Sequence, residues 1–126
     1  MNDTVTLTFL AETRNVSLAR TVAAAMSARA DLPMDQLEDV RLAVDEAVTQ
    51  LVHDAPAGSE VTCHFEVRDA VLDVRVSALS TSGTTPAQDT FSWTVLSALV
   101  DEVTASVEAG EVVLVLHISR HIAVDA

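Results

Sequence analysis

Apolar residues recur with two different periods along this chain. In TVTLTFL (4–10) threonine alternates with apolar residues, and VTCHFEV (61–67) and VLDVRVS (71–77) alternate in the same way. This period of two predicts strands with one buried face, and the short Arg68-Asp69-Ala70 turn predicts that the last two form an antiparallel hairpin. EVVLVLHIS (111–119) is apolar on both faces, which is typical of a strand in the interior of a sheet.

A spacing of three to four predicts three helices. The first follows Asn15, a residue type that favours the N-cap, and its apolar face comprises Val16, Ala19, Val22, Ala23 and Met26. Asp31-Leu32-Pro33 ends it, and the proline opens a second helix whose apolar face comprises Leu37, Val40, Val44, Ala47, Val48 and Leu51. FSWTVLSALVDEV (91–103) predicts the third, with inward residues that are either Phe91, Val95 and Leu99 or Leu96 and Val100. The polar stretch 78–90 predicts a loop.

These elements predict one domain of two layers. The order strand, helix, helix, hairpin, loop, helix, strand favours an α/β (α+β) two-layer sandwich, with helices on one face of a mainly antiparallel mixed sheet. A chain of 126 residues, 49% of them apolar, can bury a single core, so residues 1–126 are expected to form one domain.

Charge narrows the classes of partner. The chain has 19 acidic residues against 7 basic ones, all arginine, and a formal net charge of −12. Such a surface repels nucleic acid and attracts basic proteins, so direct DNA binding is not expected. No apolar run reaches the roughly 20 residues that span a bilayer, MNDTVTLTFL lacks the basic region of a signal peptide, and the single Cys63 has no disulfide partner. We therefore expect a cytoplasmic protein without membrane attachment.

The helix RLAVDEAVTQLVHDA (41–55) carries the first candidate chemistry. Glu46 and Gln50 lie four residues apart and so share one helical face, whereas Asp45 points about 100° away from Glu46 and forms no acid–base pair with it. A solvated acid at the edge of a helix is the plain alternative for Glu46. The four histidines lack metal-ligand spacing, so no metal site is expected. Trp93 is expected to serve in packing.

Three motifs together resemble a known family. LEDVRLAVDEAVTQLV (37–52) is similar to the N-box helix of RsbW-type anti-sigma factors, NVSLAR (15–20) to their first-helix motif, and FSWTVLSALVDEV to the helix after their ATP lid. These proteins are serine protein kinases on the histidine-kinase/Hsp90-like ATPase (Bergerat) fold. The resemblance covers residues from about 5 to 119, and the residues in the motifs are most similar to those of the actinobacterial anti-sigma-F branch.

The resemblance implies roles for the N-box pair. Glu46 takes the position of the base that acts on a substrate serine, and Gln50 takes the position of the asparagine that holds magnesium. Glutamine keeps the amide oxygen, but its extra methylene moves that oxygen away from the position it has in asparagine. Magnesium requires near-ideal octahedral geometry, so this shift disfavours its binding.

Other positions depart from the family pattern. Ala78 stands where the resemblance places an adenine-binding aspartate, and the glycine positions of the phosphate loops hold Ser80, Ser82, Thr90 and Ser92. The lid is shortened and carries no basic residue between 78 and 92. Losing these groups costs roughly 4–5 kcal/mol of nucleotide binding. The expectation is a degenerate ATP site with weak or no kinase activity, without a cofactor; Mg-ATP is the cofactor if the activity survives.

The partner-binding motif matches better. The resemblance implies that Arg20, with Asn15 and Ser17, contacts both an alternative sigma factor of the stress or sporulation type and an anti-anti-sigma factor of the STAS class. The alternative for Arg20 is an ion pair with a nearby acid such as Glu12.

The sequence thus favours an anti-sigma factor that sequesters a sigma factor from RNA polymerase, is released by the STAS protein and works as a homodimer. Two rival hypotheses are an active serine kinase that phosphorylates the anti-anti-sigma factor, and a decoy that binds only anti-anti-sigma proteins.

Overall fold

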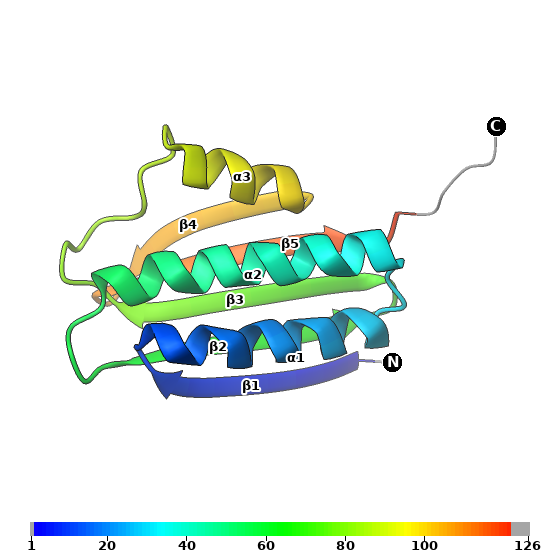
Figure 1. Cartoon of the computed structure of the whole chain (residues 1–126), viewed down its shortest axis with the longest axis horizontal. Coiled ribbons are helices and arrows are strands. Elements are labelled where there is room, and N and C mark those ends of the chain that lie inside the picture. Colours follow the sequence, from blue (N-terminus) through cyan, green and yellow to red (C-terminus); the bar gives the residue numbers. More distant parts are fainter. Residues whose placement is uncertain (1, 122–126) are drawn as a thin grey trace.

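The chain folds into two layers (Figure 1). The computed structural model describes residues 2–121, which form a five-stranded sheet with three α-helices on one face. The strands are β1 (Asn2–Leu10), β2 (Glu60–Arg68), β3 (Val71–Leu79), β4 (Glu102–Glu108) and β5 (Glu111–Ser119). The helices are α1 (Val16–Arg29), α2 (Met34–Asp54) and α3 (Phe91–Leu99), with a short 3-10 helix η1 (Thr13–Asn15) before α1. The predicted two-layer sandwich is confirmed.

The sheet has the strand order β1-β2-β3-β5-β4. The sequence predicted a mainly antiparallel, mixed sheet, but each of the four pairings within residues 2–121 is antiparallel. β5 lies between β3 and β4, which confirms its predicted interior place. Val112 and Leu114 belong to the core on the helix-covered face of β5, and Val113 on the opposite face is also buried.

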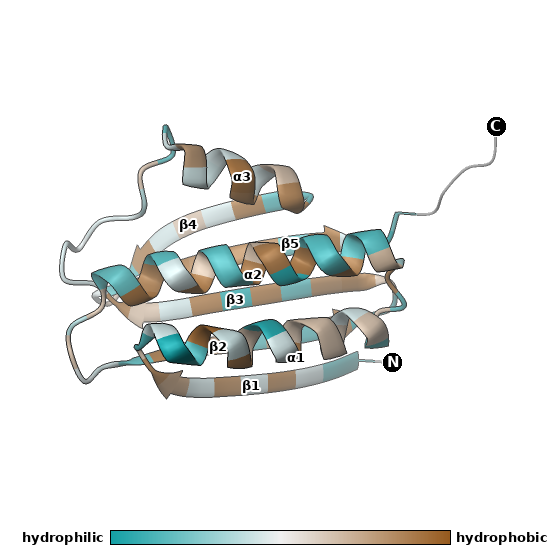
Figure 2. Ribbon diagram, viewed as in Figure 1, coloured by the Kyte–Doolittle hydropathy of each residue, from teal (hydrophilic) through white to brown (hydrophobic). Residues whose placement is uncertain are grey.

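The core lies between the helices and the inner face of the sheet. α1 packs on β2 and α2 packs on β3, and the strands alternate between hydrophobic and hydrophilic residues as predicted (Figure 2). The predicted faces of α1 and α2 are buried, apart from Val22 and Leu37, which are half-buried. Cys63 is fully buried, and this burial raises the pKa of its thiol to about 12, so the thiol stays protonated and unreactive. Among the described helices, none has the length and apolar composition to cross a membrane.

The third helix is shorter than predicted, and a strand follows it. α3 ends at Leu99, and the expected helix end at Val103 lies in β4, a strand that was not predicted, in which Val103 and Ala105 alternate with exposed residues. Of the two predicted inward sets, the second is observed, because Leu96 is buried and Val100 is half-buried against the core. Thr90 caps α3 by accepting a hydrogen bond from the Trp93 N–H (3.1 Å), so the helix starts at Phe91. Trp93 is also buried, which confirms packing for this residue, whereas Phe91 of the first set is 83% exposed.

Candidate functional site

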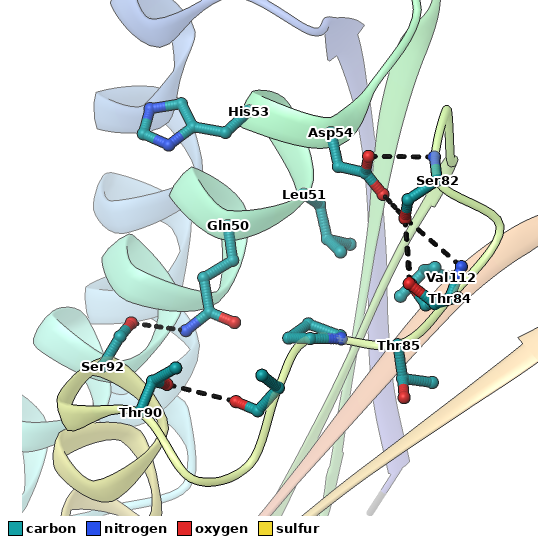
Figure 3. Close-up of a pocket in the computed structure, with 12 residues that line it drawn as sticks. Gln50, Leu51, His53, Asp54, Ser82, Thr84, Thr85, Thr90, Ser92 and Val112 are labelled. Atoms are coloured by element: carbon teal, nitrogen blue, oxygen red, sulfur yellow. Dashed lines mark hydrogen bonds between the residues drawn. The ribbon is translucent and has the colours of Figure 1, made fainter.

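A cavity of about 390 Å³ opens between the C-terminal half of α2, the 80–90 segment and the start of α3 (Figure 3). α2 contributes one wall because residues 50 to 54 cover a full turn at its end. The connection from β3 to α3 forms the opposite wall, and Val112 of β5 lies at the bottom. The lining residues are Gln50, Leu51, His53, Asp54, Ser82, Thr84, Thr85, Pro86, Ala87, Thr90, Ser92 and Val112.

Glu46 and Gln50 share one face of α2, as predicted, and both contact Ser92 of α3. The Ser92 hydroxyl donates a hydrogen bond to Oε1 of Glu46, and the amide Nε2 of Gln50 donates to Oγ of Ser92 at 2.7 Å. Nε2 also lies 3.5 Å from Oε1 of Glu46. Ser92, which stands at a glycine position of the family, is thus hydrogen-bonded to Glu46, the residue to which the resemblance assigns the role of base.

This chain of hydrogen bonds fixes the Gln50 amide. The single hydroxyl proton of Ser92 goes to Glu46, so Ser92 can only accept from Gln50, and the amide must turn its nitrogen to Ser92. Figure 3 shows the amide oxygen directed away from Ser92. Within residues 2–121 this oxygen, Oε1, is the only buried side-chain polar atom that has no hydrogen-bond partner. An acceptor left in this way costs about 1–3 kcal/mol.

Asp54 holds the 80–90 segment against the end of α2. Its carboxylate accepts hydrogen bonds from the hydroxyls of Ser80 and Ser82 and from the Ser82 N–H (3.1 Å), and its carbonyl accepts from Thr81 N–H (2.7 Å). The Ser80 hydroxyl, which donates to the carboxylate, is the main reason why the pKa of Asp54 lies below its ordinary value. We call these contacts of Asp54 with Ser80, Thr81 and Ser82 the Asp54 clamp.

The sequence reasoning did not single out Asp54. The available signal was the spacing of four that continues from Glu46 through Gln50 to Asp54 on one helical face. Ala78, expected at an adenine-binding position, is buried in β3 and does not line the cavity.

The cavity has an acidic rather than a basic electrostatic character. No arginine lines it, and all seven arginines pair with acids elsewhere on the molecule. Among residues 2–121, Asp54 is the one carboxylate in the lining. A phosphate would meet no guanidinium group here, and the polar lining consists mainly of hydroxyl groups.

The three predicted partner-binding residues lie on α1 and on the turn before it, outside the cavity lining. Arg20 pairs with Asp45 of α2 (3.3 Å), so the alternative of an ion pair with a nearby acid is observed, although Glu12, the acid named as an example, pairs with Arg14 instead. The Arg20 side chain remains 39% exposed. Ser17 is exposed.

Asn15 plays a different local role from the predicted cap. It makes no side-chain cap bond; its Nδ2 donates to the carbonyl of Leu10 at 2.9 Å. The side chain thus joins the end of β1 to the start of α1, because η1 already turns the backbone there.

The histidines on strands have hydrogen-bonding partners, as predicted. His64 pairs with the hydroxyl of Thr6 (2.8 Å) and His117 with the carboxylate of Asp73 (2.6 Å). Across residues 2–121 no three His, Cys, Asp or Glu side chains form a group that could hold a metal ion.

Comparison with known proteins places the chain in a family. A profile of the histidine kinase-like ATPase domain matches residues 9–117. The chain is 35% identical over 99 residues to the anti-sigma-F factor RsbW of Mycobacterium tuberculosis, covering 79% of this chain and 59% of that protein. It is 35% identical over 85 residues to the serine-protein kinase RsbW of Listeria innocua, covering 65% of this chain and 54% of that protein.

The likeness extends to solved structures. A crystal structure of RsbU and RsbW domains from Mycobacterium tuberculosis matches with a TM-score of 0.68 at 16% identity, covering 96% of this chain and 35% of that chain, which shows a common fold. The chain spans between half and two thirds of the length of the two curated relatives. Since the profile covers most of the chain, the protein belongs to the histidine kinase-like ATPase domain family, and within that family it is similar to RsbW proteins.

Proposed function

We propose that this protein is an anti-sigma factor that sequesters an alternative sigma factor of the stress or sporulation type and is released by an anti-anti-sigma protein of the STAS class. The observation that carries the proposal is the similarity to RsbW proteins over most of the chain. The net charge of −12 supports it, because an acidic surface speeds the encounter with a basic protein segment and disfavours DNA.

Arg20 is the proposed anchor for the partner, with Asn15 and Ser17 beside it. Its guanidinium is half-exposed, and its pair with Asp45 is a single contact of 3.3 Å, which is worth little at an exposed position. A partner carboxylate can therefore replace Asp45 at small cost, and a bidentate contact would then be available to the guanidinium.

We infer that sequestration occurs without phosphotransfer. Mg-ATP does not fit the residues present: Ser80 and Ser82, at glycine positions of the family, are bonded to Asp54, and no arginine lines the cavity. The Ser92 hydroxyl donates to Oε1 of Glu46, so a substrate serine would have to share that oxygen or approach the other carboxylate oxygen. The ATP site is therefore degenerate in this proposal.

A second candidate, the active serine kinase, has one observation in its favour. The buried Oε1 of Gln50 has no partner within the described residues and stands at the family position for a magnesium ligand. Isothermal titration with Mg-ATP separates the two functions. No binding, or a Kd in the millimolar range, supports sequestration alone. Tighter nucleotide binding, together with phosphotransfer to a STAS protein that Glu46→Ala abolishes, would establish the kinase.

A binding screen of the purified chain against the sigma factors of its organism tests the main proposal. We expect one to bind and Arg20→Ala to weaken it by roughly thirtyfold, the effect of a hot-spot arginine. Arg29→Ala is the matched control, because Arg29 also lies on α1 and pairs with a single acid, Asp3 (2.6 Å). Equal losses in both variants would point to non-specific charge. Recovery of STAS proteins without any sigma factor would instead favour the decoy.

We further propose a homodimer in the cytoplasm, with β1 and α1 near the shared surface. β1 is an edge strand, since it pairs only with β2 in the described sheet, and an edge offers unpaired backbone groups to a second copy.

A further inference from the structure

The cavity beside α2 combines a carboxylate, free acceptor atoms and an apolar wall. Leu51 and Val112 form part of the apolar wall, and Asp54 supplies the one carboxylate. The volume of about 390 Å³ lies at the lower end of the range for small-molecule sites. No arginine compensates the carboxylate from the lining, so a ligand with a negative charge is disfavoured.

Asp54 retains capacity as an acceptor. Its Oδ2 accepts from the hydroxyls of Ser80 and Ser82, but its Oδ1 accepts only from the Ser82 N–H, at 3.1 Å. Each carboxylate oxygen has two lone pairs, so Oδ1 can take a further donor from the cavity without breaking the Asp54 clamp.

Gln50 supplies a second acceptor one helical turn before Asp54. Its amide nitrogen points to Ser92, which in turn donates to Glu46. The amide oxygen Oε1 therefore points away from Ser92 (Figure 3), and it is buried without a partner in the described part of the chain. Gln50 lines the cavity, so a ligand there that donates to this oxygen would satisfy the buried acceptor left open within residues 2–121.

We propose that the cavity binds a small amphipathic amine. Its ammonium group donates to Oδ1 of Asp54 and to Oε1 of Gln50, and its apolar body packs against Leu51 and Val112. The site differs from a nucleotide site in the sign of the charge that it selects. The inference concerns the cavity alone and does not depend on the partner proposed above.

A matched pair of probes tests the sign of the charge. Phenethylamine and phenylacetate share a phenyl ring on a short chain and end in an ammonium and a carboxylate. In an NMR titration of the full chain at neutral pH, we expect phenethylamine to shift the backbone amide signals of Gln50, Asp54 and residues 82–85, with a Kd at least tenfold lower than that of phenylacetate. Equal affinities, tighter binding of phenylacetate, or signals that move elsewhere or do not move would overturn the proposal.

Variants locate the two acceptors. Asp54→Asn removes the charge while keeping an oxygen, and should reduce the affinity for phenethylamine by about tenfold, the effect of losing a charged hydrogen bond. Gln50→Leu should reduce it severalfold, while Thr49→Val, on the same helix but outside the lining, should leave it unchanged. Unchanged affinity in both Asp54→Asn and Gln50→Leu would overturn the assignment. Circular dichroism checks that each variant is folded. If either variant is not folded, the comparison of the two probes with the natural chain still tests whether the cavity prefers an ammonium group.

Discussion

A few side chains give the cavity its character. Asp54 gathers the hydroxyls of Ser80 and Ser82 around one carboxylate, and Ser92 places its hydroxyl on Glu46. In both places a hydroxyl group stands where the family resemblance expects glycine, and a carboxylate of α2 satisfies it. The positions that would cradle phosphates are thereby used for internal hydrogen bonds, and those of Ser80 and Ser82 hold the start of the 80–90 segment against α2.

The Asp54 clamp should depend on pH. The folded-state pKa of Asp54 lies below the ordinary value of 3.8, because the Ser80 hydroxyl donates to the ionised form. The stability that the clamp contributes is therefore fully present above the unfolded pKa and is lost as the pH falls through the folded pKa. Hydrogen exchange of the amides of residues 81–84 should become faster, relative to that of β3, as the pH drops below about 4.

Asp54→Asn provides the control for this pH dependence. Asparagine cannot ionise, so exchange in this segment should be roughly tenfold faster at neutral pH and should show no additional change on acidification. A variant that retains the acid-dependent step would show that another group controls the segment.

The structural elements differ in how far local sequence defines them. β2, β3 and α2 have long periodic patterns and lie where predicted. α3 is short, and its start depends on the cap at Thr90, which selects Trp93 and Leu96 as the buried face. β4 was not predicted: it lies at the edge of the sheet and has only two half-buried positions, Val103 and Ala105, and its first two residues were included in the predicted helix 91–103.

The cap at Thr90 gives a prediction for α3. Thr90→Ala removes the acceptor for the Trp93 N–H and should lower the free energy of unfolding by about 1 kcal/mol, because this helix of nine residues has few other bonds at its start. Urea denaturation measures the loss. Thr90→Ser keeps the hydroxyl and should stay within about 0.5 kcal/mol of the natural chain; an equal loss in both variants would assign the effect to the methyl group.

The charge of the protein acts over its whole surface. All seven arginines are paired, which leaves an excess of acids without a basic partner. Exposed ion pairs contribute little, whereas repulsion among the excess acids opposes the compact state. The same field is what would draw a basic partner to the surface.

Salt should therefore stabilise this protein. Raising sodium chloride from roughly 20 mM to 200 mM screens the repulsion and should raise the Tm by a few degrees, with the pH held at 7. Differential scanning calorimetry measures the shift. An unchanged or lower Tm would show that the arginine pairs outweigh the repulsion.

Part of the site was predictable from single residues. The spacing of four placed Glu46 and Gln50 on one face, and the family motifs marked the serines that now line or border the cavity. The bond between Ser92 and Glu46 was not predictable, since these residues are 46 apart in sequence. The acid that pairs with Arg20 was not predictable for the same reason, because Asp45 approaches it only when α2 packs against α1.

Periodicity along the chain was enough to define the two layers and the buried faces of β2, β3 and α2, because burial of apolar side chains follows the local period of the backbone. Composition alone defined the acidic surface. The packing of α2, α3 and the 80–90 segment decided the rest. A hydrogen bond requires two atoms to be placed to within a few tenths of an ångström, and for residues far apart in sequence only the assembled core achieves this, as it does for Asp54, Ser92 and the amide of Gln50.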